Sequence, residues 1–441
     1  MASPPQRTPR LAPEVRREQL LDAALDVLTE GGFDAVTVEA VARRAGVTRP
    51  VIYDMFGDLG GLMVALIDRE ERAALAPLLD IVGVGGDPGE DVDPEAFLVD
   101  AIGAFLRAVK ANPRTWRLVL MPPRGTSGEL RERIRRSRRM LAERITELLD
   151  WGIARRGGPG GLDHGLAARV IVAAGEDAAR LMLAHPRRFS LERLTSITRD
   201  LLALLPADAQ ASGSSPPAVP DAASAASSAS ASASGDAAPP AVGPVRRVPR
   251  AQRREQLIDV ALTLVAEEGF GALSMEAVAR RAGINRVVVY RSFANLQLLL
   301  VAMLRRGDQR TRAALDAVLP TEPGQQSPTR LLGDSLAAFL AAVLADPVTW
   351  RVALLRPESA PVALQKLVNR RRTQLARRLE PLVRWGAGEI GGAPADLDVE
   401  LMARMLLTIG EELGRLALDD PDFPPDRLMA GVWALLDAVA E

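Results

Sequence analysis

The chain has 441 residues, of which 48% are apolar and 25% charged, and its formal net charge at pH 7 is −1. This is the composition of an ordinary globular protein, and the length favours roughly two to four domains. The absence of cysteine excludes disulfides, thiolate metal sites and cysteine nucleophiles. Neither His164 nor His185 has a second histidine at ligand spacing, so a histidine-rich metal site is excluded, and we expect no cofactor.

The N-terminal residues show no apolar core of the kind that a secretory signal requires. Apolar stretches such as Leu298–Leu304 fall short of the roughly 18–20 residues that cross a bilayer. We therefore expect a cytoplasmic protein that has no membrane partner.

The sequence contains a long internal duplication. The run Glu39–Gly46 returns without change as Glu276–Gly283, and the block Ala104–Arg117 returns in similar form as Ala338–Arg351. The period is far longer than the roughly 20–50 residues of stacked repeats. The chain is therefore two copies of one domain.

Both copies show the spacing of amphipathic helices. From Leu20 to Leu28, for example, apolar residues recur at i, i+3 and i+4, and Gly31-Gly32 ends the pattern. No β-hairpin or βαβ signature is present. We expect an all-α fold with roughly nine helices in each copy.

A helix-turn-helix is predicted near the start of the first copy, over residues 37–56. Thr37 can cap a short helix, and Gly46 can end it in the left-handed conformation. Thr48 can then cap a second helix, in whose first turn Pro50 fits well. An ordinary helical hairpin would show a similar pattern, but two such motifs in two copies favour the DNA-binding interpretation.

The second copy repeats this arrangement over residues 274–293, with Ser274 and Asn285 at the cap positions. On these two motifs the chain resembles the TetR/AcrR family of bacterial transcriptional regulators. The matching positions are Thr37 through Ala42, Ala45-Gly46-Val47, Tyr53 and Phe56, and their repeats Ser274 through Ala279, Ala282-Gly283-Ile284, Tyr290 and Phe293.

The resemblance implies, in each copy, a three-helix head followed by a larger helical body that binds an effector and forms a four-helix dimer interface. Family members usually act as homodimers, so a fused pair resembles a single-chain pseudo-dimer of two TetR-like domains. The predicted divisions are a disordered N-terminus (1–13), a first head (14–58) and body (59–205), a disordered Ala/Ser/Pro linker (206–248), and a second head (249–295) and body (296–441).

The resemblance also implies which residues meet a double-stranded DNA operator. Tyr53 and Tyr290, the only tyrosines in the chain, occupy the position where the family contacts phosphate; packing between helices is the alternative. The reading helices open with arginine or asparagine, which can bond bases bidentately. The predicted DNA-binding residues are Thr37, Thr48, Arg49, Pro50, Tyr53, Ser274, Asn285, Arg286, Val287, Tyr290 and Arg291.

The heads depart from the family and from each other. Met55 and Ser292 stand where a histidine or tyrosine is usual, and Leu59 and Leu296 where a lysine is common, which removes phosphate contacts. Residues 1–60 hold seven arginines and nine acidic residues, whereas residues 245–300 hold nine arginines and five acidic residues. Because phosphate neutralisation dominates affinity, we expect the second head to bind DNA more strongly, on an asymmetric site.

Aromatic residues at matched positions in the two bodies are candidates to line effector cavities, although core packing is the favoured interpretation. Arg117 and Arg351 can meet an anionic ligand or extend to water. Glu176 and Glu411 can orient a ligand; pairing with Arg180 and Arg415 at i+4 is favoured. The candidate ligand residues are Phe105, Trp116, Arg117, Met121, Trp151, Glu176, Phe339, Trp350, Arg351, Trp385 and Glu411.

We therefore expect a DNA-binding transcriptional regulator, a repressor released by a small-molecule effector, with the two repeats paired within one chain through their last two helices. The alternative is a ligand-binding or interaction scaffold whose heads have lost DNA binding. An enzyme is disfavoured because no nucleophile–base pair, metal cluster or phosphate loop is visible in the sequence.

Overall fold

The computed structural model describes residues 12–32, 35–83, 88–89, 91–121, 128–157, 161–203, 249–320, 322, 324–355, 362–390 and 393–440. The predicted linker and nearly all of the predicted disordered N-terminus lie outside these residues. Within the described part every regular element is helical, as the spacing predicts.

The described residues of the first copy form nine α-helices. They are α1 (Pro13–Gly31), α2 (Val38–Ala45), α3 (Arg49–Phe56), α4 (Leu59–Val82), α5 (Pro94–Ala111), α6 (Pro113–Leu120), α7 (Gly128–Arg156), α8 (His164–Ala184) and α9 (Leu191–Ala203).

The second copy repeats this order, and a short 3-10 turn follows its first helix. Its elements are α10 (Arg250–Glu268), η3 (Phe270–Ala272), α11 (Met275–Arg281), α12 (Arg286–Ser292), α13 (Leu296–Val318), α14 (Pro328–Ala345), α15 (Pro347–Ala353), α16 (Val362–Glu389), α17 (Val399–Asp419) and α18 (Pro425–Ala440).

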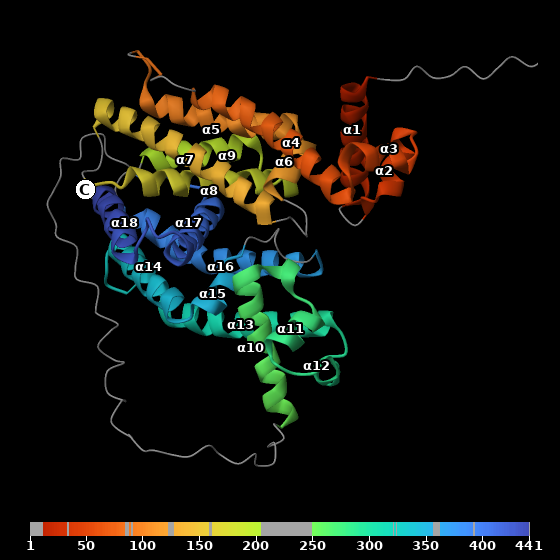
Figure 1. Cartoon of the computed structure of the whole chain (residues 1–441). Helices are drawn as coiled ribbons and strands as arrows, with labels where there is room; N and C mark the ends of the chain where they lie inside the picture. Colours follow the sequence, from red (N-terminus) through yellow and green to blue (C-terminus); the bar gives the residue numbers. More distant parts are fainter. Residues whose placement is uncertain are drawn as a thin grey trace, which may run out of the picture.

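Each head has a small core of its own. In the first head, Leu20 of α1, Val41 of α2 and Ile52 of α3 are fully buried together with Leu62 of α4. Leu118 of α6 belongs to the same cluster. The head is therefore packed directly on its body, and α4 runs from one into the other (Figure 1).

The two bodies meet along their C-terminal helices, which we call the seam: α8 and α9 against α17 and α18. Helix α8 packs on α17, its counterpart in the second copy. Leu166 of α8 shares an apolar cluster with Leu428 and Val432 of α18, and Leu194 of α9 shares another with Leu401 of α17. Figure 1 shows both heads on the same side of the molecule, with the seam between the bodies.

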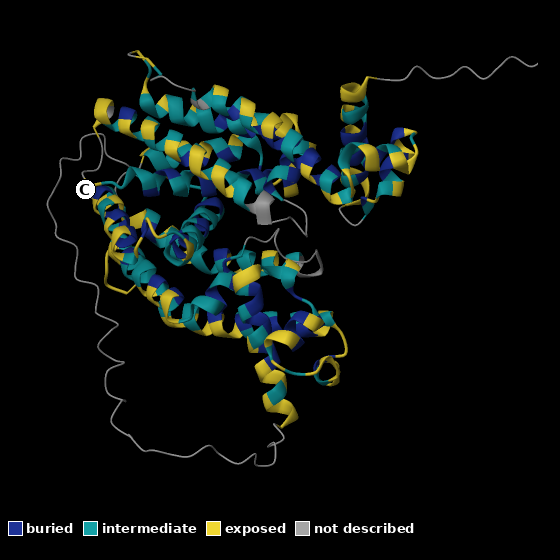
Figure 2. Cartoon of the chain, in the orientation of Figure 1, coloured by how far each residue is buried: buried dark blue, intermediate teal, exposed yellow. Residues whose placement is uncertain are grey.

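Ion pairs cross the seam at its edges. Arg193 of α9 pairs with Asp398 and, at 3.1 Å, with Glu400. Arg427 of α18 pairs with Asp163, the cap residue of α8, at 2.6 Å. Buried positions lie along α8 and α17, and exposed positions cover the outer faces of the heads (Figure 2).

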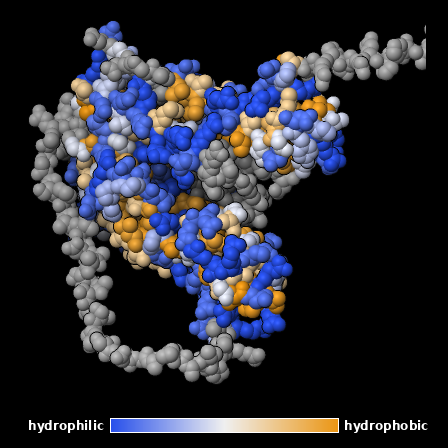
Figure 3. Space-filling model, viewed as in Figure 1, coloured by the Kyte–Doolittle hydropathy of each residue, from blue (hydrophilic) through white to orange (hydrophobic). Residues whose placement is uncertain are grey.

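Helix α14 qualifies our expectation about membranes. By length and composition it is apolar enough to cross a bilayer, and the bent pairs α3–α4 and α12–α13 would also pass as broken spans. Apolar residues gather over α14 on the face drawn in Figure 3. The helix nevertheless packs on α13, α16, α17 and α18, with Leu340 and Val343 buried.

Candidate nucleic-acid interface and ligand cavity

In the first head the turn between α2 and α3 has the predicted geometry at three of its four key positions. Thr37 Oγ1 accepts a hydrogen bond from the backbone N–H of Ala40 at 3.0 Å, and Gly46 is left-handed with φ of 67°. Pro50 lies in the first turn of α3. Thr48 does occupy the N-cap position, but its side chain makes no capping hydrogen bond, so that part of the prediction is wrong.

In the second head all the predicted caps form. Ser274 Oγ accepts from the backbone N–H of Ala277 at 3.0 Å, and Asn285 Oδ1 accepts from that of Val287 at 2.9 Å. Gly283, with φ of 63°, ends the preceding turn. The cap ties the Asn285 side chain to its own helix, so Asn285 must exchange this bond to reach a base.

The reading helices α3 and α12 bury one side and expose the other. Ile52 and Val289 are fully buried, whereas Tyr53 is 49% exposed and Tyr290 45%. Tyrosines that merely filled a gap between helices would be buried. The other predicted DNA-binding residues on these helices, Arg49, Pro50, Arg286, Val287 and Arg291, are exposed as well.

The opening arginine of each reading helix is paired with the first helix of its own motif. Arg49 Nη2 lies 2.9 Å from Glu39 Oε1, and Arg286 Nη1 lies 2.7 Å from Glu276 Oε1. All four side chains are more than half exposed. The hydrogen bond from Arg286 lowers the pKa of the Glu276 carboxyl. Our reading of the sequence missed these pairs, although the same Glu and Arg, ten residues apart, occur in both copies.

Two adjacent glutamates on α4 connect the first head with the body. Glu70 pairs with Arg69 at 2.7 Å and accepts a hydrogen bond from Thr115 of α6. Arg69 also reaches Glu18 and Asp22 of α1. Glu70 therefore belongs to a network that extends into the head.

The next residue, Glu71, faces the body instead. Its Oε1 accepts from Ser137 Oγ of α7 at 2.7 Å, and its Oε2 lies 2.9 Å from Arg133 Nε. Both glutamates are only 4% exposed. A displacement of α4 at Glu71 would therefore also move the adjacent Glu70, and with it the network that holds the head.

A cavity of about 260 Å³ lies inside the first body; we call it the body cavity. Its walls are mostly apolar, and its polar lining includes Glu71, Ser137, Arg138 and Glu176. Of the predicted ligand residues in this copy, it is lined by Phe105, Trp116, Trp151 and Glu176. The rings of Phe105 and Trp116 meet edge to face, with centroids 5.2 Å apart.

A second cavity, of about 520 Å³, opens between the two copies; we call it the seam cavity. Helices α8 and α9 line it from one side, and α14, α16, α17 and α18 from the other. Trp385 is the one predicted ligand residue on its wall. Leu98, Ile102 and Ile171 line both cavities, so the two adjoin.

The remaining predicted ligand residues line neither of these two cavities: Arg117, Met121, Phe339, Trp350, Arg351 and Glu411. Arg117 donates to the carbonyl oxygen of Leu183 at 3.3 Å, and Arg351 to that of Leu418 at 2.9 Å. Each arginine thus binds the C-terminal end of α8 or α17, where cations are favoured. Trp350 is 4% exposed and packs edge to face on Phe339.

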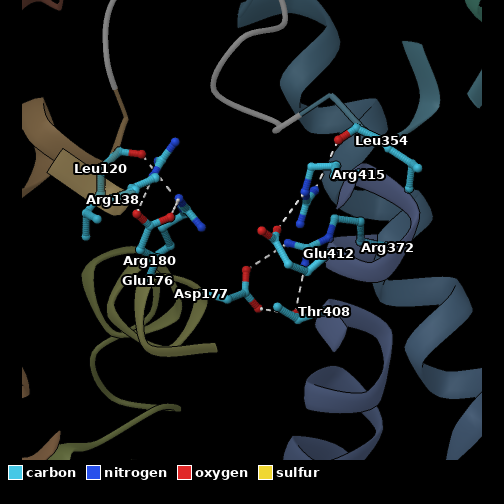
Figure 4. Close-up of polar contacts among 10 residues, drawn as sticks. All are labelled: Leu120, Arg138, Glu176, Asp177, Arg180, Leu354, Arg372, Thr408, Glu412 and Arg415. Atoms are coloured by element: carbon cyan, nitrogen blue, oxygen red, sulfur yellow. Dashed lines mark hydrogen bonds and ion pairs between the residues drawn. The ribbon is translucent and has the colours of Figure 1, made fainter. Parts of the chain in front are cut away.

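The favoured glutamate pairs form in one copy only. Glu176 pairs with Arg180 at 2.9 Å, as predicted, and also with Arg138 of α7 (Figure 4). In the second copy the prediction is wrong: Arg415 pairs with Glu412, three residues away, while Glu411 pairs with Arg372 of α16. The preference failed because α16 brings a closer guanidinium that helical spacing does not reveal.

The sequence model of bacterial regulatory proteins of the tetR family matches this chain twice, at residues 20–66 and 257–303. These segments contain the two helix-turn-helix motifs and parts of the helices on either side of each motif. The chain thus carries the tetR-family DNA-binding domain twice in tandem.

Curated relatives match parts of the chain. The transcriptional repressor KstR of Mycolicibacterium smegmatis is 35% identical over 106 residues, 22% of this chain and 45% of that protein. The transcriptional activator FasR of the same organism is 26% identical over 178 residues, 40% of this chain and 77% of that protein. For KstR, therefore, the match spans less than half of the relative's length.

Solved structures of the family align with about one copy. A TetR-like regulator from Rhodococcus sp. RHA1 is 28% identical, covers 45% of this chain and 99% of its own, and has a TM-score of 0.35. The fatty acid degradation regulator FadR of Bacillus halodurans is 20% identical, with coverages of 45% and 96% and a TM-score of 0.36.

Proposed function

We propose that this TetR-family chain is a cytoplasmic, non-enzymatic repressor that binds an asymmetric operator with both of its heads and is released by a small molecule. The observation that carries the proposal is the contact of α8 with α17. Equivalent helices of the two copies meet, as in an isologous dimer interface, and so one chain supplies two reading helices.

The two heads would read unlike half-sites. Arg49 and Pro50 open one reading helix and Arg286 and Val287 the other, so the base contacts they offer differ. Paired reading helices place their half-sites about 34–36 Å apart, or one turn of DNA. The operator we propose is therefore two unlike half-sites at this spacing, without true palindromic symmetry.

The first body offers a route for release by a ligand. Glu71 on α4 lines the body cavity, and Glu70 beside it bonds Thr115 and Arg69 of the network that holds α1. A ligand that binds better to one position of α4 shifts the head toward that position. Coupling of this kind is commonly worth about 1–3 kcal/mol.

The alternative function, a scaffold that does not bind DNA, is favoured by the ion pairs of the two heads. Arg49 and Arg286, which would read bases, are already paired with Glu39 and Glu276, and the first head carries more acidic residues than arginines. In a scaffold these pairs would only stabilise the heads.

Selection of binding sites from a random duplex library, with the full-length protein at two salt concentrations, tests the proposal. We expect an enriched site with two unlike half-sites, bound more weakly at high salt. A palindrome would indicate that two chains pair through one dominant head. No enrichment at low salt would overturn the proposal in favour of the scaffold.

A further inference from the structure

The two bodies contribute different residues to the two described cavities. Helix α7 packs Ile134 against the core of the first head and carries Trp151 near its other end, and the body cavity extends along it between these residues. In the second body, α16 is the counterpart of α7. The second-copy residues that match the head-side wall, namely Leu304, Asp308, Thr311, Arg371, Arg372 and Glu411, line neither described cavity.

Arg371 occupies this space in the second body. It stands at the position of Ser137, with the offset of 234 residues that also relates Trp151 to Trp385. The Arg371 guanidinium lies 2.7 Å from Asp308 and donates a hydrogen bond to Thr311. A long guanidinium with two partners thus replaces a single hydroxyl.

The partners of Arg371 are specific to the second copy as well. Thr311, which is fully buried, stands where the first copy has Ala74, and the shorter Asp308 stands where it has Glu71. In the first body Ser137 donates to Glu71, and Ala74 offers only a methyl group on the cavity wall. Arg371 and Thr311 are therefore larger than their counterparts and fill the second chamber, and the shorter Asp308 leaves room for the Arg371 guanidinium.

The packing around Phe339 differs as well. At the position of Ala179 the second copy has Gly414. An ideal Cβ at Gly414 would lie 2.8 Å from Leu354 Cδ1 and 3.3 Å from the Phe339 ring, which is closer than a methyl group tolerates without movement of these side chains. The glycine lets both side chains approach α17, and the ring then packs on Trp350.

The lining of the body cavity indicates the class of its ligand. Three of its charged groups are matched within the protein: Arg138 pairs with Glu176, and Glu71 pairs with Arg133. Trp151 is 9% exposed, and its indole N–H has no hydrogen-bond acceptor among the described residues. A buried donor without an acceptor is costly, and the cavity is slightly below the about 300–1,000 Å³ of drug-sized pockets.

We propose that each chain has one effector chamber: the first body binds a small, neutral, largely apolar molecule with an acceptor oxygen for Trp151, while Arg371 closes the second. The inference deepens the proposed ligand-responsive function and rests on it. Ligand occupancy would then be sensed by one copy, whereas a homodimer of two identical subunits presents two equal chambers.

Fluorescence titration of the full-length protein with prodan, a neutral naphthalene with one carbonyl group, tests the chamber without DNA. We expect one site per chain. Ser137→Arg, which introduces the second copy's guanidinium, should weaken binding about tenfold or more. The reciprocal Arg371→Ser should keep the first site and add a second. Unchanged binding in Ser137→Arg, or no second site in Arg371→Ser, would overturn the proposal.

Two further variants separate the body cavity from the seam cavity. Ala101 lines only the body cavity, and its counterpart Ser335 lines only the seam cavity. Ala101→Leu should therefore weaken prodan binding about tenfold, and Ser335→Leu should leave it unchanged. If instead Ser335→Leu weakened prodan binding and Ala101→Leu did not, the probe would bind in the seam cavity, and the inference would be contradicted. Ala101→Leu and Ser335→Leu also test whether prodan binds in the body cavity if Ser137→Arg does not fold.

Trp151→Phe tests the orientation of the ligand. Loss of the indole N–H should shift the emission of bound prodan to shorter wavelength, since its carbonyl would lose a donor, while one site per chain remains. Unchanged emission would refute the role assigned to Trp151. Because none of these titrations contains DNA, failure to find an operator would reject the proposed regulation without changing the binding result.

Discussion

The carboxylate of Asp177 on α8 accepts a hydrogen bond from Arg372 on α16, at 3.0 Å and from 195 residues further along the chain. Thr408 of α17 donates to its other oxygen at 3.1 Å (Figure 4). Burial alone would raise the pKa of the Asp177 carboxyl, but the charges of Arg372 and Arg180 and the hydrogen bonds from Arg372 and Thr408 outweigh it and keep the pKa below its ordinary value. An ionised, fully partnered group therefore joins the two copies.

Asp177→Asn should weaken this junction. The buried Arg372 would keep Glu411 but lose one of its two carboxylates, and removal of a charged hydrogen-bond partner typically costs about 2 kcal/mol. We expect a loss of that size in the free energy of unfolding, measured by urea denaturation of the full-length protein.

Glu147→Gln is the control for that measurement. Glu147 pairs with Arg144 three residues away on α7 and is 64% exposed, so its loss should change the unfolding free energy by less than about 1 kcal/mol. An equally small effect of Asp177→Asn would mean that the buried junction adds nothing to the pairing of the copies.

The seam should weaken in acid. Burial opposes the ionisation of Asp163, Asp398 and Glu400, but hydrogen bonds from Arg427 and Arg193 outweigh it, so the pKa of each lies below its ordinary value of 3.8 or 4.5. A carboxylate with a lowered pKa in the folded state stabilises that state at every pH above its unfolded pKa. This stabilisation is lost as the pH falls through the folded value.

Stability from these groups should therefore stay constant between pH 7 and about pH 5 and decline below about pH 4. Urea midpoints of the unchanged protein and of Asp398→Asn, measured from pH 7 to pH 3, check this expectation. The variant should have the flatter profile. Parallel profiles would show that Asp398 does not contribute to acid sensitivity.

Local rules were enough to find the helices and three of the four helix-turn-helix caps. Thr37, Ser274 and Asn285 bond backbone groups two or three residues away, so the sequence around them determines their role. Thr48 failed to cap although its neighbours also fit the pattern, because a capping position permits the side-chain bond and does not enforce it.

Contacts between distant helices could not be derived from spacing. Glu411 pairs with Arg372 because α16 and α17 pack together. Periodicity within one helix cannot predict which other helix packs against it. The difference between Ser137 and Arg371 was visible once the copies were aligned. That Arg371 binds Asp308 and Thr311 could be seen only in the folded chain, where these residues lie next to it.

Arg286→Ala should weaken operator binding more than Arg49→Ala. Both arginines are exposed at the start of a reading helix, but the second head has more basic residues to neutralise phosphate. An arginine contact with guanine is worth about 1–3 kcal/mol, so the loss should reach about tenfold or more in Kd. Fluorescence anisotropy on the selected duplex measures both variants.

Arg312→Ala, on the outer face of α13, serves as the control for charge alone. Its partner is Asp308 on the same helix, and its side chain is 62% exposed. It should leave the Kd for DNA nearly unchanged. Equal losses for Arg286→Ala and Arg49→Ala would refute the idea that the second head dominates.

Tyr53→Phe and Tyr290→Phe should each weaken DNA binding by about three- to tenfold, the value of one neutral hydrogen bond. Neither variant removes a charge, so the slope of log Kd against log salt concentration should stay the same. Because both side chains are about half exposed, the free energy of unfolding should change by less than about 0.5 kcal/mol. Undiminished affinity in both variants would exclude the predicted phosphate contacts.

Glu276→Gln should strengthen DNA binding. Glu276 holds the Arg286 guanidinium at 2.7 Å in the absence of DNA, and DNA must displace it. The pair is more than half exposed, so its loss should change folding by less than about 1 kcal/mol. Removal of the carboxylate also adds one unit of positive charge to the interface, and the salt dependence should steepen by roughly one ion.

Glu39→Gln is the matched change in the first head, where Glu39 and Arg49 form the equivalent pair at 2.9 Å. Glu39→Gln should also strengthen DNA binding, but by less. The acidic residues of the first head repel phosphate, so we expect that head to contribute less to affinity. Weaker binding by Glu276→Gln would mean that the glutamate positions Arg286 for its base. The pairs seen in both heads would then prepare the reading helices for DNA, because the carboxylate would restrict the arginine to the conformer that binds.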